Sequence, residues 1–187
     1  MDLAEAHARA LAATRVYVAG IGEHQWSDPT PDDDWDLRTL TNHIVSGNFW
    51  VGELMAGKTI QEVGDRLDGD VLGNDPLAAY DESAKVAADA FSQPGAMQDL
   101  AAVSYGPVPG EVYCGHRLLD VLIHGWDVAK ATGQDPMLEP ELVEQVWAVV
   151  EPELDGFQAS GSFGTPVDVP ADADRQTALL AALGRHA

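Results

Sequence analysis

The sequence predicts an all-α protein, a four-helix bundle with additional C-terminal helices. Four long segments repeat apolar residues at the spacing of one helix face, about 3.6 residues. Proline, glycine and aspartate stand between these segments, where helices begin and end. The length of 187 residues and the hydrophobic content of 45% suit one domain with a sizeable core. We therefore expect a single helical domain over residues 1–187.

The helices are expected in a simple order. The four long ones span residues 3–21, 36–55, 75–92 and 111–132, and two later ones span residues 140–154 and 174–183. Asp75 and Pro76 suit the start of the third helix, because Asp is a favoured N-cap residue and Pro fits the first helical position. The connections are a loop at residues 23–35 and a long acidic stretch at residues 56–74. A turn or short extended piece follows at residues 100–110, and a coil at residues 157–170.

The charge balance excludes several classes of partner. Lys and Arg together number 10 against 31 Asp and Glu, a formal net charge of −21. This argues against nucleic acid and anionic membranes, because both are polyanions. No apolar run has the length of a membrane span, and no basic segment precedes a hydrophobic one at the N-terminus, so we expect a cytoplasmic protein. Cys114 is the single cysteine, which rules out an intrachain disulfide and a sulfur-based zinc site.

The most informative stretch lies in the fourth long helix. Asp120 and His124 are four residues apart and share a helix face, which His116 and Asp127 extend into a narrow polar stripe. The rest of the circumference is apolar, so the helix is expected to be buried. A carboxylate and an imidazole at this spacing can hold one metal ion from a single helix. The ordinary alternative is a stripe that faces water.

The second helix adds a further candidate. His43 falls within the apolar arc of that helix, and Gly47, one turn later, leaves room beside it. A histidine at such a position either hydrogen-bonds in the core or acts as a ligand. His7 in the first helix is expected at the surface or its boundary. In a four-helix bundle, ligands from separate helices meet in one interior, so His43 can join Asp120 and His124.

Three blocks of sequence together resemble one family. Thr30-Pro31 and Trp35 lead into the helix that carries His43. The second block is L-D-V-L-I-H-G-W-D-V-A-K-A-T-G over residues 119–133, and the third covers residues 163–184. In this order the blocks resemble the DinB-like, mycothiol-dependent maleylpyruvate isomerase N-terminal family, in its actinobacterial single-domain branch. The resemblance covers nearly the whole chain.

The resemblance implies a DinB-like four-helix bundle with one divalent metal ion held by three side chains. From the types of ligand we expect zinc first and nickel second. The family's histidine on the second helix corresponds to His43, and its acid-x-x-x-His pair corresponds to Asp120 and His124. It also implies mycothiol as a thiol cosubstrate, with an electrophilic small molecule as its partner. For the assembly, a homodimer is a candidate. Asp32 and Asp33 stand after Thr30-Pro31, where the family often has a cysteine.

Three alternatives for the function stay open at this point. The first is an enzyme, a metal-dependent thiol transferase or isomerase, because two histidines and a carboxylate leave positions free on a metal. Arg117 and His116 could then orient a substrate or move a proton, and Tyr105 and Trp50 could line its pocket; the alternatives are plain surface and core roles. The second class is a module that binds a metal or a small molecule without turnover. A purely structural pair of His43 and Asp120, without metal, is a third alternative.

Overall fold

The protein is all-α apart from one small hairpin, as the sequence predicts. The computed structural model describes residues 1–32, 35–160 and 164–187, with side chains at 158–160 excepted. Its elements are α1 (Leu3–Ala19), α2 (Leu37–Met55), α3 (Ile60–Val63), α4 (Pro76–Phe91), β1 (Leu100–Val103), β2 (Gly106–Pro109), α5 (Gly110–Thr132), α6 (Pro140–Ser160) and α7 (Arg175–Ala182). Among the described residues, no helix combines the length and the apolar character needed to cross a bilayer.

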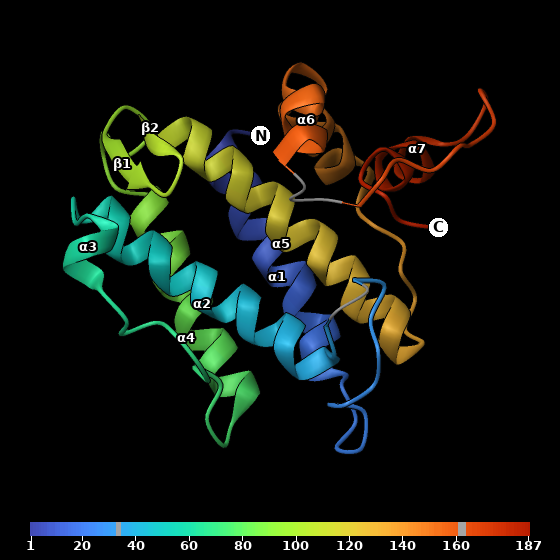
Figure 1. The fold of residues 1–187 in the computed structure, drawn as a ribbon, viewed down its shortest axis with the longest axis horizontal. Coiled ribbons are helices and arrows are strands. Elements are labelled where there is room, and N and C mark those ends of the chain that lie inside the picture. Colours follow the sequence, from blue (N-terminus) through green and yellow to red (C-terminus); the bar gives the residue numbers. More distant parts are fainter. Residues whose placement is uncertain (33–34, 161–163) are drawn as a thin grey trace.

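Helices α1, α2, α4 and α5 form the bundle (Figure 1). Helix α1 packs along α5, α2 packs along α4, and the two pairs meet through contacts of α1 with α4 and of α2 with α5. Helix α6 packs against α5 and α1, and α7 packs against α6. The apolar faces of these helices share one core, in which Trp126, Tyr80 and Phe91 are the largest buried side chains.

Aspartates begin most of the helices, as their preference for N-cap positions predicts. The side chain of Asp36 accepts a hydrogen bond from the backbone N–H of Thr39 at the start of α2. The equivalent residues of α1, α4 and α7 are Asp2, Asp75 and Asp174. Asp36 therefore caps α2, and Asp33 and Asp34 lie outside the described residues.

Several boundaries differ from the expected ones. Helix α1 ends at Ala19 instead of residue 21, and α5 begins at Gly110. The connection 56–74 contains the short helix α3, which has a capping box at Thr59 and Glu62. The extended piece at 100–110 is an antiparallel hairpin of β1 and β2. Helix α6 continues to Ser160, although it contains Pro152.

Tertiary packing accounts for the greater length of α6. Phe157, which we expected in a coil, packs against the core and lies with its ring centroid 5.5 Å from that of His116. Local sequence signals near Pro152 and Gly156 disfavour helix, but burial of an aromatic ring outweighs them. The expected coil at 157–170 also includes residues 161–163, which lie outside the described residues.

The expectation for His7 was wrong. Its side chain is fully buried on α1 and packs edge-on against Phe91, with ring centroids 5.1 Å apart. Neither ring nitrogen has a hydrogen-bond partner within the described part of the chain. Burial, and after it the charge of Arg117, lowers the pKa of His7 to about 3. His7 is therefore a neutral core residue.

Candidate metal centre

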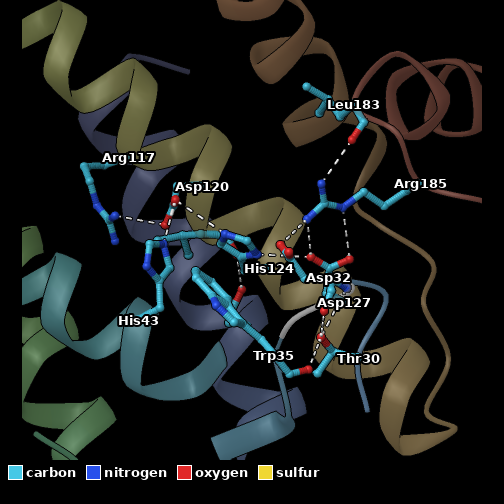
Figure 2. Close-up of polar contacts among 12 residues, drawn as sticks. Thr30, Asp32, Trp35, His43, Arg117, Asp120, His124, Asp127, Leu183 and Arg185 are labelled. Carbon is cyan, nitrogen blue, oxygen red and sulfur yellow. Dashed lines mark hydrogen bonds and ion pairs between the residues drawn. The ribbon is translucent and has the colours of Figure 1, made fainter. Parts of the chain in front are cut away.

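His43 on α2 converges with Asp120 and His124 on α5 (Figure 2). Nε2 of His43 lies 3.1 Å from Oδ1 of Asp120, and Nε2 of His124 lies 3.6 Å from the same oxygen. One donor atom from each of the three side chains lies within 4.8 Å of the other two. The four-residue spacing places Asp120 and His124 on one helix face, and the packing of α2 against α5 supplies the third side chain.

The three donor atoms have a spacing that suits a divalent ion. Zinc bound to nitrogen and oxygen at about 2.0–2.1 Å in a tetrahedral site separates neighbouring donors by about 3.3 Å. The two separations from Asp120, 3.1 and 3.6 Å, lie on either side of that value. Three donors leave one position for another ligand. Since the side chain of His43 is 36% exposed, a ligand from solvent can reach the group there.

Asp120 is fixed by Arg117, one turn earlier on α5. Nη1 of Arg117 donates to Oδ2 of Asp120 at 2.9 Å, and Nη2 donates to Oδ1 of Asn48 at 3.2 Å. Burial acts to raise the pKa of Asp120, but Arg117, followed by His43 and His124, outweighs burial and holds this pKa below its usual range. Asp120 is thus a carboxylate whose Oδ1 faces both histidines.

Gly47 makes room for this arginine. A Cβ atom at position 47 would lie 2.4 Å from Nη1 and 2.6 Å from Nη2 of Arg117, closer than atoms can approach. The space that the sequence predicted beside His43 is therefore filled by a guanidinium from another helix. Arg117 is 8% exposed, so its surface role was the wrong alternative. Arg117 is buried because α5 packs against α2, and helix periodicity alone does not reveal which helices contact each other.

His124 has a second carboxylate behind it. Oδ2 of Asp127, three residues later on α5, lies 3.1 Å from Nδ1 of His124, and Asp127 is fully buried. Burial acts to lower the pKa of His124, but Asp120 and Asp127 outweigh it and raise this pKa. A carboxylate on Nδ1 fixes the ring and leaves Nε2 as the atom that faces Asp120. The spacing His-x-x-Asp was visible in the sequence stripe, whereas the burial of Asp127 was not.

Trp35, from the loop before α2, covers both histidines. Its ring centroid lies 4.7 Å from that of His43 and 5.8 Å from that of His124, and all three rings appear together in Figure 2. The aromatic wall limits the rotation of both imidazoles. The sequence marked Trp35 only as part of a family block, so its contact with the two rings comes from the structure.

A second acidic group adjoins the first. Asp32, Asp127 and His124 also have atoms close enough to share an ion. Nη2 of Arg185, however, lies 2.9 Å from Oδ2 of Asp32 and 2.9 Å from Oδ2 of Asp127. The guanidinium supplies the positive charge that these two carboxylates need. We therefore regard the group formed by His43, Asp120 and His124 as the candidate metal centre.

The other residues singled out from the sequence, His116, Tyr105 and Trp50, make contacts of their own. Nδ1 of His116 lies 2.6 Å from the hydroxyl of Tyr105, and its Nε2 lies 3.1 Å from Oε2 of Glu153. The side chain of His116 is 18% exposed, so it is partly buried between the hairpin and α6. His43 itself is half-buried at the edge of the core, and Trp50 is partly buried against it. The apolar arc of α2 therefore placed His43 deeper than it is.

The fold and the site define a class, an all-α bundle with a His–Asp–His group suited to a divalent ion. Residues 7–129 match the family described as the mycothiol maleylpyruvate isomerase N-terminal domain, and the chain belongs to that family. Two proteins of Mycobacterium tuberculosis, one from strain CDC 1551 / Oshkosh and one from strain ATCC 25618 / H37Rv, are each 37% identical to the chain over 190 residues. Each match covers 99% of this chain and 98% of the relative, and both relatives carry the name uncharacterized protein. No solved structure matches the chain.

Proposed function

We propose that the protein binds one divalent metal ion through His43 Nε2, Asp120 Oδ1 and His124 Nε2, with zinc as the first candidate and nickel as the second. We further propose that it uses the ion to activate a small thiol of the mycothiol type. The thiol then reacts with an electrophilic small molecule, in a transfer or an isomerisation. The observation that carries the proposal is the spacing of the three donor atoms, 3.1 and 3.6 Å from a shared carboxylate oxygen.

The charge of the donor set supports a thiolate as the additional ligand. His43 and His124 are neutral when they bind a metal, so Asp120 alone contributes a negative charge. Arg117 donates a hydrogen bond to the other oxygen of the same carboxylate and offsets part of its negative charge. A divalent ion held there keeps an excess of positive charge and favours an anion at its open position. When bound, such an ion lowers the pKa of a coordinated thiol, so that the sulfur is nucleophilic at neutral pH.

The chain's own residues would hold and orient this chemistry. Arg117 keeps Asp120 ionised, and Asp127 fixes the ring of His124. Trp35 closes one side of the two imidazoles, while the exposed side of His43 leaves access for the thiol and its partner. In an addition to a double bond, the sulfur bonds to the electrophilic carbon, and the proton lost by the thiol is transferred to the adjacent atom of that double bond. The family's name motivates mycothiol and maleylpyruvate as the first reagents to test.

One observation favours a second candidate. His43 and Asp120 are already within hydrogen-bonding distance at 3.1 Å, which is what a structural histidine–carboxylate pair needs. In that case the same residues would stabilise the contact between α2 and α5, and no metal would be involved. A metal-binding module without turnover lies between the two proposals.

Metal and thiol assays separate these functions. Metal-free protein is titrated with zinc, the bound metal is counted, and mycothiol is followed with maleylpyruvate and other electrophiles. We expect about one ion per chain and consumption of thiol only when metal is present. His43→Ala should abolish both, and His24→Ala, which removes an exposed loop histidine, should change neither. A protein that stays empty after zinc addition refutes the proposal, and zinc uptake without thiol consumption supports the binding module.

A further inference from the structure

Arg185 reaches the candidate centre from the far end of the chain, outside the residues 7–129 that match the family. Its side chain is 4% exposed. Nη2 and Nε contact the two carboxylate oxygens of Asp127 at 2.9 and 3.3 Å, and Nη2 also contacts Asp32 at 2.9 Å. Nη1 donates to the carbonyl of Leu183 at 3.0 Å. Figure 2 shows the guanidinium between the C-terminal segment, the loop and α5.

The end of α7 is built to deliver this arginine. The backbone N–H of Arg185 donates to the carbonyl of Leu180, and that of Gly184 donates to Ala181, which is the pattern of a Schellman motif. Gly184 has a φ of +80°, and a Cβ atom there would lie 2.5 Å from the carbonyl carbon of Gly164. Only glycine suits this turn, so the direction of the chain into the core is fixed by its backbone.

A chain of contacts connects Arg185 to the metal centre. A fully buried carboxylate such as Asp127 needs a compensating charge, because an unpaired buried charge is strongly destabilising. Arg185 supplies that charge. Asp127 in turn contacts Nδ1 of His124, which leaves Nε2 to face Asp120. Carboxylates placed behind a histidine ligand orient the ring and raise its basicity.

We propose that Arg185 is a positioning residue for the metal centre, acting through Asp127 to fix the ring and the tautomer of His124. Its contact with Asp32 also holds the loop that carries Trp35 over the two histidines. The C-terminal segment thereby completes a site whose ligands come from α2 and α5. This inference rests on the proposed metal site but not on the thiol chemistry.

Zinc affinity of full-length variants tests the inference. Arg185→Gln should weaken zinc binding by about 10- to 100-fold, the range found for changes behind a metal ligand. Arg175→Gln is the matched control, because Arg175 lies on α7, in the same C-terminal segment, but is exposed and pairs with Glu144 of α6 at 2.8 Å. The control should bind zinc as wild type does. Affinities are measured by competition with a chelator, at a temperature where circular dichroism shows each metal-free variant to be folded.

A second readout separates orientation from stability. In the zinc-loaded protein, nitrogen-15 NMR of the imidazoles should show His124 protonated on Nδ1, with a slowly exchanging proton. Arg185→Gln should weaken or remove that signal, and Arg175→Gln should keep it. If Arg185→Gln does not fold, the double variant Asp127→Asn with Arg185→Gln removes both buried charges, and it should show the same loss of affinity.

The outcomes are distinct. Wild-type zinc affinity in folded Arg185→Gln, or in the double variant, overturns the inference and leaves the proposed function standing. An equal loss of zinc affinity in Arg175→Gln also overturns the inference, because any change in the C-terminal segment would then weaken binding. A wild type that takes up no zinc overturns the inference together with the proposed site. Failure to consume thiol, with these zinc affinities as expected, counts against the thiol chemistry alone.

Discussion

Arg117 and Asp120 form a partly buried ion pair within α5, with Nη1 of the arginine 2.9 Å from Oδ2 of the carboxylate. The pair determines which oxygen of Asp120 faces the histidines. Oδ2 is bound to the guanidinium, and Oδ1 lies 3.1 Å from His43 and 3.6 Å from His124. A single carboxylate thus serves both the core and the candidate metal site, and its substitution should affect the two differently.

Asp120→Asn should weaken zinc binding by roughly 10- to 100-fold or more, since a neutral amide is a poor ligand for a divalent ion and even changes behind the ligands cost this much. At a zinc concentration about 100 times the wild-type dissociation constant, wild type gains about 2.7 kcal/mol of stability, and the variant should gain about 1.4 kcal/mol after a 10-fold loss of affinity or about 0.4 kcal/mol after a 100-fold loss. Melting with and without zinc measures this difference. Asp68→Asn, which removes an exposed loop carboxylate, is the control. The structural pair is supported instead if zinc does not change the melting temperature of wild type and the variant melts at a lower temperature both with and without zinc.

Gly47→Ala should destabilise the protein by about 1–3 kcal/mol, the usual cost of overpacking a core. The added methyl group would lie 2.4 Å from Nη1 of Arg117 and force the guanidinium away from Asp120. Gly156→Ala on α6 is the control, because no atom of the described residues lies within 4 Å of its Cβ position. Removing a glycine there should stabilise the helix by about 0.5–1 kcal/mol. Urea denaturation measures both, and equal effects at the two positions would contradict the packing argument.

Trp35 should report metal binding through its fluorescence. Its ring lies 4.7 Å from His43 and 5.8 Å from His124, so the charge and orientation of these imidazoles affect its emission. Zinc addition should change the emission of wild type, and Trp35→Phe should remove the change. Trp147→Phe should retain it, because Trp147 donates to the carbonyl of Arg175 at the contact of α6 with α7. If the change survives in Trp35→Phe, the ring does not cover the metal position.

His7→Phe should make stability less dependent on pH. In the folded protein the pKa of His7 is lowered to about 3, mainly by burial, whereas the unfolded chain titrates near 6.5. Between these values the unfolded state binds the extra proton. The stability associated with neutral His7 is therefore complete above about pH 6.5 and falls by up to about 1.4 kcal/mol per unit as pH drops toward 3.

Phenylalanine at position 7 removes this titration and keeps an aromatic ring against Phe91. Its free energy of unfolding should equal or exceed that of wild type at pH 5, since the change also removes two buried nitrogens that have no hydrogen-bond partner among the described residues. Denaturant titrations at pH 7, 6, 5 and 4 give the comparison. Parallel curves for the two proteins would show that His7 titrates normally in the native state.

Local sequence determined the elements and one part of the site. Helix periodicity and the aspartate caps located the long helices to within a few residues, because N-cap preference and apolar spacing act over one or two turns. The same periodicity placed Asp120 and His124 on one face of α5, since residues four apart on a helix are neighbours. The same periodicity singled out His43, and the family blocks then assigned it to one site with Asp120 and His124 and included Trp35.

Tertiary structure decided which side chains are buried and which distant residues contact each other. His7 was expected at the surface or its boundary, and a surface role was one alternative for Arg117. Both are buried, because the faces that a helix hides depend on which helices surround it. The pairing of Arg185 with Asp127 joins residues 58 positions apart, and no spacing rule predicts such a contact. The sequence thus determined which side chains were available on each helix. The packing of α2 against α5, and of the C-terminal segment beside α5, decided which of them meet, because burying charged groups is favourable only where partners from separate segments neutralise one another.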